Sequence, residues 1–222
     1  MARSSNRPRL ATVTIPATDL RPDTFLRHAV GEERGFWAHG HRWVAHRGVA
    51  AEIRGPDGGC RDRFDQVATA ARDIALEPIL PARTARAPRV RFYGGFSFRA
   101  DHHAVGVWAD FPTWLFHVPV FELEGDGTGD AWLRARALVT EENEDDALER
   151  LRRNAEALRA ELATLADFSS PDARTKGRAT ATDRASWEAA VVASLEAIQQ
   201  GKVSKAVLAR TLDVELEQEI DP

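Results

Sequence analysis

Between residues 10 and 54, apolar side chains alternate or cluster in short runs separated by glycine and proline. Alternation with a period of two is typical of a strand that buries one face. The pattern predicts strands in LATVTIP, GFWAHG, HRWVAHRG and VAAEIRG, with a hairpin turn around Gly40. A helix is predicted next, from about Asp62 to Leu76. Its apolar stripe comprises Phe64, Val67, Ala71 and Ile74.

The strand pattern returns after the proline-punctuated connection PILPARTARAP. It predicts strands in RVRFYGGFSF, AVGVWADFPTWLFHVPVFELE and AWLRARALVT, the last two separated by the turn GDGTGD. The aromatic side chains of these strands are expected to lie in the core or against a sheet, namely Trp108, Trp114, Phe116 and Phe121. Gly94 and Gly95 lie inside a predicted strand, where glycine usually marks a bulge or a close backbone approach.

A helical period replaces the strand pattern at EENEDD. Leucine and alanine then recur at alternating spacings of three and four, which predicts a long amphipathic helix whose stripe is Leu148, Leu151, Ala155, Leu158, Leu162 and Leu165. A second helix is predicted from about Asp183 to Gln200, with Gly201 as its C-terminal cap. Its inward stripe comprises Trp187, Val191, Leu195 and Ile198. A final strand is expected from Val203 through TLDVELE.

Together these elements predict an α+β protein, with antiparallel sheets that carry helices packed on their outer faces. Three regions are expected. Residues 1–168 form a β-rich region that ends in the long helix, and residues 169–182 form a flexible linker, because SSPDARTKGRATAT is polar. Residues 183–222 begin a further region.

Charge and composition exclude several classes of function. The chain of 222 residues has a net charge of −4 and arginines interspersed with acids, so no basic surface for nucleic acid is expected. No apolar run approaches the roughly 20 residues of a membrane span, and MARSSNRPRLATVTIP lacks the apolar stretch of a signal peptide. The single cysteine, Cys60, excludes an internal disulfide. We therefore expect a cytoplasmic protein with no nucleic acid or membrane partner.

Histidines and acidic turns offer weak metal candidates. His39 and His41 share one face of a predicted strand and His46 lies nearby, but no fourth ligand has a convincing spacing. His102 and His103 lie in a turn and are expected to be solvated. The turn GDGTGD lacks the spaced oxygen ligands of a calcium loop. No metal site is therefore predicted in this chain.

The segment GKVSKAVLAR, residues 201–210, is the strongest candidate for chemistry. The chain has only three lysines and carries its positive charge on arginine, yet two lysines, Lys202 and Lys205, lie here. Only lysine gives up its proton within reach of neutral pH. On a strand, Lys205 would lie among apolar neighbours, which disfavour the charged form and create a general base. The alternative is that both are ordinary surface lysines.

Two stretches carry a family resemblance. SWEAAVVASLEAIQQGKVSKAVLAR resembles the region of the chorismate-utilising enzymes in which a helix that begins near a tryptophan leads into a K-x-V-L-A-R strand. RFYGGFSF, followed by aromatic and proline-containing strands, resembles the N-terminal half of the same family. Within that family the sequence is most similar to the isochorismate synthases, over the chain from about Arg89 onward.

The resemblance implies a role for Lys205 and for groups outside this chain. Lys205 would be the general base that activates water to attack C2 of chorismate, while a glutamic acid protonates the departing C4 hydroxyl and Mg²⁺ anchors a substrate carboxylate. Lys202 would be a surface residue. The family's acid, its magnesium ligands and its substrate-binding arginine have no counterpart after Arg210, so no cofactor or metal is expected to bind this chain alone.

Three interpretations follow because these groups of the family have no counterpart after Arg210. The first is the N-terminal part of an isochorismate synthase that is inactive alone: a fragment, a truncated gene product, or one half of a split enzyme whose partner is a complementary C-terminal half. The second is the corresponding part of a salicylate-forming synthase of the same family. The third, from another class, is a non-catalytic chain that binds a partner through its last strand. Nothing in the sequence separates a menaquinone from a siderophore pathway.

Overall fold

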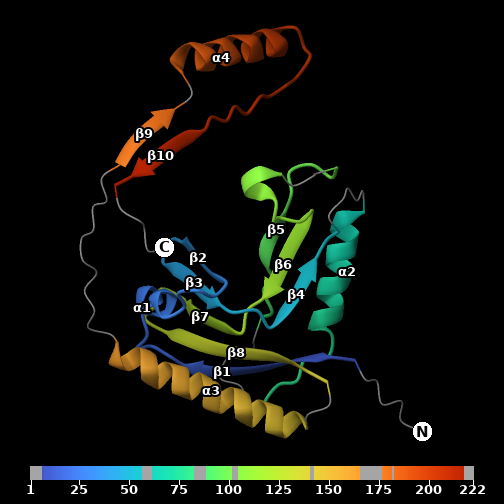
Figure 1. Ribbon diagram of the computed structural model, residues 1–222. Coiled ribbons are helices and arrows are strands. Elements are labelled where there is room, and N and C mark those ends of the chain that lie inside the picture. The colour runs from blue at the N-terminus through green and yellow to red at the C-terminus, as the bar shows by residue number, and fades with distance from the viewer. Residues whose placement is uncertain are drawn as a thin grey trace. The chain divides into compact units, whose positions relative to one another are not determined.

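The computed structural model in Figure 1 describes residues 7–56, 62–82, 89–101, 105–140, 143–165, 177–181 and 183–217, with only the backbone of Val107 included. The chain divides into two compact units, Met1–Phe168 and Ser169–Pro222. The first unit combines two antiparallel sheets with helices, which confirms the predicted α+β class. Within the described ranges, no helix has both the length and the apolar character of a membrane span.

A five-stranded antiparallel sheet forms the centre of the first unit. Its strand order is β1-β8-β7-β3-β2, with bounds Arg9–Pro16, Ala131–Val139, Phe121–Gly125, Arg42–Arg47 and Arg34–His39. β1 pairs with β8 along its whole length, although more than a hundred residues separate the two strands in sequence. The predicted hairpin is confirmed: β2 pairs with β3, and the turn uses Gly40 at φ +59°, a conformation that glycine adopts without strain.

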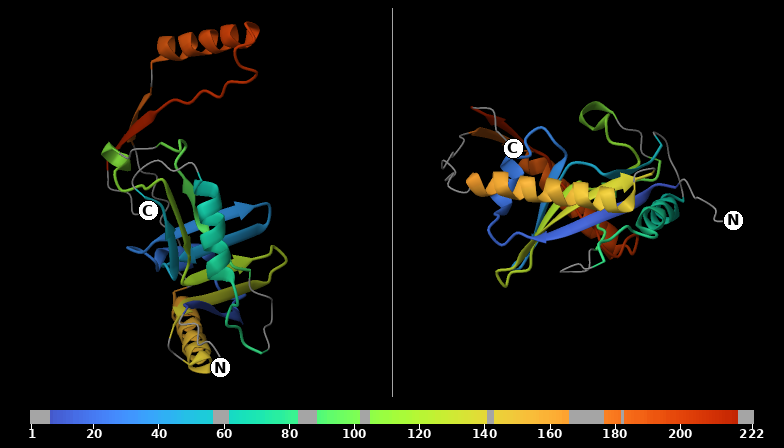
Figure 2. Two further views of the ribbon diagram at one scale, coloured as in Figure 1. Left: turned by 90° about the vertical axis from the view of Figure 1, so that its right-hand side faces the viewer. Right: turned by 90° about the horizontal axis from the view of Figure 1, so that it is seen from below.

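Helix α3 (Glu144–Thr164) packs against β1 and β8 and covers one face of this sheet (Figure 2). It begins at Asn143, whose side-chain oxygen accepts hydrogen bonds from the backbone N–H groups of Asp145 and Asp146. Acidic residues in its first turn also suit the positive end of the helix dipole. Four residues of the predicted stripe lie on the buried face together with Ala147, whereas Leu148 is only partly buried, as is Leu165, which follows the end of the helix. The buried residues are Ala147, Leu151, Ala155, Leu158 and Leu162.

A smaller antiparallel sheet has the order β4-β6-β5, with bounds Ala51–Arg54, Trp114–Val118 and Tyr93–Phe96. On one face, Ile53 and Trp114 form a core cluster with Val67 of helix α2 (Arg63–Ala75), which matches the helix predicted there. On the other face, the rings of Tyr93 and His117 lie against His46 of the large sheet. The two sheets therefore face one another, and each has a helix on its outer side.

Several predictions for the aromatic strands need correction. Of RVRFYGGFSF, only Tyr93–Phe96 forms a strand, and Trp108 is 59% exposed in a short 3₁₀ helix (Gly106–Trp108) rather than in a core. Trp108 leaves the core because the chain turns away from the sheet there, and its ring packs edge-on against Phe111. Trp114 is buried as predicted, and Phe116 and Phe121 are partly buried against the core clusters.

The sequence predicted a close backbone approach at Gly94 but missed a short helix near the N-terminus. Gly94 is a close backbone approach, as expected, because a Cβ atom there would lie 1.9 Å from the carbonyl oxygen of Leu115. Gly95, by contrast, faces open space. The short helix α1 (Pro22–Arg27), which begins with proline in its first turn, had no periodic signal long enough to predict it.

The described part of the second unit contains a two-stranded antiparallel sheet and a helix. β9 (Gly177–Ala181) pairs antiparallel with β10 (Leu212–Leu216), and α4 (Arg184–Gln199) lies between them in sequence. The predicted linker 169–182 is therefore wrong for residues 177–181. These residues alternate threonine or arginine with alanine, and they pair with β10. Their polar composition suggested a linker because it gives no sign of this pairing. The rest of the predicted linker lies outside the described residues.

Helix α4 has the predicted limits but lacks the predicted burial. Asp183 caps it by accepting a hydrogen bond from the backbone N–H of Ser186 at 3.0 Å, and Gly201 follows it at φ +68°. No residue of α4 is buried, and Leu195 of the expected inward stripe is 53% exposed. The described part of the second unit thus contains the elements of a fold without a core of its own.

Candidate functional site

The candidate lysine lies in the second unit, in the connection between α4 and β10. The chain leaves the helix through Gly201, and the backbone N–H of Lys202 donates a hydrogen bond to the carbonyl of Ala197 at 2.9 Å. Residues 203–211 then run without regular secondary structure, so the strand predicted to begin at Val203 begins only at Leu212. Lys205 is exposed in this connection.

The apolar neighbours expected around Lys205 do not cover it within the described chain. Val207 is 81% exposed and Leu208 is 36% exposed. A strand orders its side chains because a partner strand fixes the backbone, and residues 203–211 have no such partner among the described residues. Among the described residues, no buried apolar side chains surround Lys205.

One contact connects the end of the lysine segment to the helix before it. The guanidinium carbon of Arg210 lies 6.0 Å from the ring centroid of Trp187, within the range of a cation–π interaction. Both residues belong to the stretch on which the sequence resemblance depends. Their contact indicates that the tryptophan and the arginine help to define the path of the segment that carries Lys205.

The described histidines of the sequence analysis lie in different environments. His39 and His41 are exposed on and beside the β2–β3 turn, whereas His46 is buried on β3. In the part of the chain that the structure describes, no group of three His, Cys, Asp or Glu side chains could hold a metal ion. His102 and His103 lie outside the described residues.

The structure reveals a second candidate, which the sequence did not suggest: a charged cluster between the two sheets. Its centre is Glu122 on β7, whose side chain is fully buried. One carboxylate oxygen accepts hydrogen bonds from Arg91 at 2.6 Å and from Arg134 at 2.9 Å. The other accepts from the hydroxyl of Tyr93 at 3.0 Å and from Arg136 at 3.4 Å.

Glu124 extends this cluster toward the edge of the sheet. Its carboxylate pairs with Arg91 and with Arg134, each at 2.6 Å. Arg91 thus bridges the two glutamates, and so does Arg134. The cluster places three arginines, Arg91, Arg134 and Arg136, around two carboxylates, so it retains an excess of positive charge.

The electrostatics of the cluster keep both glutamates ionised. Burial by itself raises the pKa of Glu122, but the guanidinium groups of Arg136, Arg134 and Arg91 outweigh it, and the net pKa is lowered. The pKa of Glu124 is lowered in the same way, with burial opposed by hydrogen bonds from Arg91 and Arg134. Burial and the neighbouring Glu122 charge together raise the pKa of the Tyr93 hydroxyl, which therefore stays a hydrogen-bond donor.

A neutral histidine pair borders the cluster. The ring of His46 stacks on Tyr93 with centroids 3.9 Å apart, and its centroid lies 5.2 Å from that of His117. Burial, followed by repulsion from His117, lowers the pKa of His46 to about 4. His117 is shifted in the same direction by burial. Both rings are therefore uncharged at neutral pH.

Comparison with known proteins identifies the family. The sequence profile of a family described as chorismate binding enzyme matches residues 1–222, the whole chain. The chain belongs to the chorismate-binding enzyme family. This membership confirms the family resemblance carried by the segment around Lys205. A search of curated protein sequences finds no significant match.

A solved structure confirms the fold of this family member. MenF, the menaquinone-specific isochorismate synthase from Escherichia coli, aligns with a TM-score of 0.53 at 15% sequence identity. The alignment covers 97% of this chain but only 43% of MenF. The chain thus spans less than half the length of the protein it resembles, and at this identity the likeness concerns the fold.

Sequence reasoning found the lysine segment and missed the charged cluster. One signal was available: FELEG and WLRARALV alternate apolar residues with glutamate and arginine. That alternation predicted strands, but it does not tell whether the charged face of a strand meets solvent or protein. Opposite charges at alternate positions of two neighbouring strands also suit a buried ladder of ion pairs.

Proposed function

We propose that this chain is part of an isochorismate synthase, which isomerises chorismate to isochorismate. In the proposed reaction, Lys205 removes a proton from water, the water oxygen bonds to C2 of chorismate, the ring double bonds shift, and the C4 hydroxyl leaves after receiving a proton from a general acid. The water supplies the hydroxyl that the substrate loses, so the reaction balances without an oxidant or a reductant.

The observation that carries this proposal is the position of Lys205 in a family member. It lies in K-x-V-L-A-R, directly after a glycine-capped helix that begins near Trp187, which is the motif carried over from the isochorismate synthases. A lysine can serve as the base because its neutral form accepts a proton. Arg210 and Trp187, in contact within the same stretch, would position the segment.

Completion of the active site requires residues beyond the described ones. The alignment covers 43% of MenF, and the described part of the second unit buries no side chain. We propose that the remaining half of the fold covers α4 and the lysine segment, and that it supplies the general acid. Burial against it would give Lys205 the low-polarity surroundings that it lacks in the described chain.

Magnesium belongs to that remaining half in this proposal. The acidic and histidine side chains of the described residues form no group that fits a metal ion, so no step is assigned to a metal held by this chain. Mg²⁺ binds through oxygen ligands and keeps several waters, which suits a site that anchors a substrate carboxylate. Its ligands would come from the complementary half.

A non-catalytic role remains as a second candidate, because one observation favours it. The large apolar side chains of the second unit are widely exposed: Val192, Leu195, Ile198, Val203, Val207, Leu208, Leu212, Val214 and Leu216. Apolar surface of this extent marks an interaction site. A chain that only bound a partner would use this surface and would have no need of Lys205.

The test compares three variants in an enzyme that joins this chain to the complementary half of the fold. Lys205→Ala is expected to lower turnover by roughly two to four orders of magnitude with chorismate binding largely intact, because a general base acts on water. Lys205→Arg is expected to be nearly as damaging, since a guanidinium keeps its proton. Isochorismate formation and the KM for chorismate are the measurements.

Lys202→Ala is the matched control and is expected to be close to neutral, because Lys202 lies outside the motif. Rescue by Lys205→Arg would identify a charge anchor in place of a base. Full activity of Lys205→Ala would refute the proposed role of Lys205, whereas no isochorismate formation by the unsubstituted joined protein would favour the non-catalytic candidate. The chain without its complement is expected to be inactive, because it lacks the proposed acid.

A further inference from the structure

A large exposed apolar surface lies on the connection between β5 and β6, residues 97–113, at one end of the small sheet (Figure 1). Its described large apolar side chains are mostly exposed, and Phe98 is 100% exposed. They are Phe98, Val105, Trp108 and Phe111. Apolar residues that gather in this way on a folded unit mark an interaction site. All of them belong to the first unit, so this surface is distinct from the exposed apolar residues of α4 and β10.

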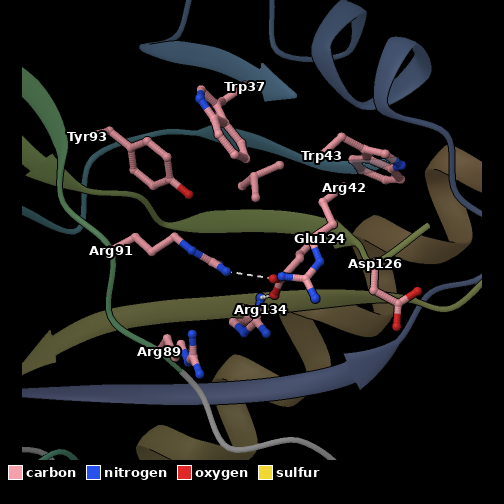
Figure 3. Close-up of a pocket in the computed structure, with 10 residues that line it drawn as sticks. Trp37, Arg42, Trp43, Arg89, Arg91, Tyr93, Glu124, Asp126 and Arg134 are labelled. Atoms are coloured by element: carbon pink, nitrogen blue, oxygen red, sulfur yellow. Dashed lines mark hydrogen bonds and ion pairs between the residues drawn. The ribbon is translucent and has the colours of Figure 1, made fainter. Parts of the chain in front are cut away.

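The backbone around Phe98 is held by Arg63, the first residue of α2. Unlike Arg91, which pairs with Glu124 (Figure 3), Arg63 binds backbone carbonyl groups. It donates to the carbonyl of Ser97 at 2.7 Å and to that of Phe98 at 3.4 Å. The Arg63 side chain is buried. Because a buried guanidinium needs acceptors for its N–H groups, the arginine and these carbonyls hold each other in place.

Hydrogen bonds within the connection add to this support. The backbone N–H of Ser97 donates to the carbonyl of Thr113 at 2.8 Å, which closes the base of the connection. The Ser97 hydroxyl donates to the carbonyl of Arg99 at 2.7 Å, and Arg99 pairs with Asp101 at 2.6 Å. The turn is therefore ordered on both sides of Phe98 while its ring lies in solvent. An exposed side chain on an ordered backbone loses little conformational entropy on binding, so it is well suited to anchor a partner.

The other end of the connection carries an aromatic pair. The rings of Trp108 and Phe111 meet edge to face with centroids 5.4 Å apart. The backbone N–H of Phe111 donates to the carbonyl of Trp108 at 2.9 Å, which orders the chain between them. Aromatic residues are enriched at the centres of protein–protein interfaces, where a few side chains supply most of the binding energy. The connection therefore combines the composition of a protein-binding surface with an ordered backbone.

We propose that residues 97–113 form a docking surface for the complementary half of the fold, with Phe98 as the side chain that enters an apolar pocket of that half. The occupant follows from length, because the alignment covers 97% of this chain but only 43% of MenF, so more than half of MenF has no counterpart here. This inference rests on the proposed function. It adds a contact on the first unit to the covering of α4 and the lysine segment proposed above.

The charge of the connection favours a protein over a lipid surface. Its charged residues are one arginine, Arg99, against two aspartates, Asp101 and Asp110, which gives a net charge of −1 with the histidines neutral. An anionic lipid surface attracts clusters of lysine and arginine, and the connection has no such cluster. Arg99 is moreover paired with Asp101. An apolar pocket of a protein suits this surface better.

Hydroxyl-radical footprinting with mass spectrometry tests the docking surface on unsubstituted protein. The chain alone is compared with the joined protein that contains the complementary half. Phe98 and Trp108 are expected to be labelled at least about fivefold more slowly in the joined protein, because the centre of an interface excludes water. Val30, which is exposed after α1, is the control and is expected to keep its labelling rate. Equal labelling of Phe98 in both proteins would overturn the proposal.

Substitution measures what the anchor contributes. Phe98→Ser is expected to leave the urea midpoint of the chain alone unchanged, because the ring is already in solvent, and to lower that of the joined protein by about 0.5–1 M. Val30→Ser is the matched control and is expected to change neither midpoint. An equal loss in the chain alone and in the joined protein would show that Phe98 only supports the first unit, and would refute its role as an anchor.

Three further outcomes separate this inference from its alternatives. Labelling of Phe98 in the chain alone that falls as the protein concentration rises would assign the surface to a second copy and overturn the proposal. Isochorismate formation by a joined protein in which Phe98 stays exposed would overturn the docking surface and keep the proposed function. Protection of Phe98 in a joined protein that forms no isochorismate would support the docking surface and count against the proposed function.

Discussion

At the scale of single residues, Glu122 is the most consequential side chain of the first unit. It is fully buried and neutralises part of the charge of Arg91, Arg134 and Arg136. We expect Glu122→Gln to lower the free energy of unfolding by about 3–5 kcal/mol, because removal of one partner leaves buried charge uncompensated. Urea unfolding measures this change.

Glu149→Gln is the control for that measurement. Glu149 is exposed on α3 and pairs there with Arg152 and Arg153, so its loss is expected to change the free energy of unfolding by less than about 0.5 kcal/mol. If both variants had equally small effects, the buried cluster would not hold the two sheets together.

His46 makes stability depend on pH. Its pKa falls from 6.5 to about 4 on folding, so between these values the unfolded chain binds a proton that the folded chain does not. The contribution of His46 to the free energy of unfolding is fully present above pH 6.5 and is lost as the pH falls toward 4. We expect His46→Gln to flatten the pH dependence of the unfolding midpoint in this interval, while His39→Gln, at an exposed position, leaves it unchanged. A slope that His46→Gln did not alter would assign the pH dependence to other groups.

At the scale of elements, α3 covers the main core by packing on the apolar face of the large sheet. Leu151 is 2% exposed and packs with residues of β1 and β8 in one cluster. We expect Leu151→Ala to lower the free energy of unfolding by about 2–5 kcal/mol, since it removes apolar contact and leaves a cavity. Arg152→Ala, one position along and solvent-exposed, is expected to have little effect. Equal effects in thermal or urea unfolding would mean that α3 does not pack as described.

Alternate residues in the strands of the large sheet face two different buried environments. On β7 and β8, one set of alternating residues packs beneath α3, whereas the other set carries Glu122, Glu124, Arg134 and Arg136 into the space between the sheets. Each strand is therefore buried on both faces, one apolar and one ionic. This arrangement demands that every charge find a partner, because burial of a lone ion is costly.

At the scale of the whole molecule, the two units differ in what stabilises them. The first has buried clusters under α2 and α3, while the described part of the second buries no side chain. In hydrogen exchange of the chain alone, we expect the amides of α4 to exchange far faster than those of α3, because a helix without tertiary packing opens readily. Protection of α4 equal to that of α3 would contradict this expectation. Size-exclusion chromatography would then show whether a second copy covers it.

Much of the architecture could be predicted from the sequence because local physics decides it. The period of α3, the caps at Asp183 and Gly201, and the turn at Gly40 each depend on residues close together in the chain. The fold class follows from the same signals, and the motif around Lys205 led to the family. The role of Lys205 as a base stays a prediction.

Only the tertiary structure decided which polar faces are buried and which apolar faces are not. The glutamates and arginines of β7 and β8 look like a solvated face until a second sheet lies against them, and the stripe of α4 looks like a core face although nothing in the described chain covers it. A period of two or 3.6 tells which residues share a face. What that face meets depends on segments far away in sequence, and so burial and charge pairing arise from contacts that no local pattern contains.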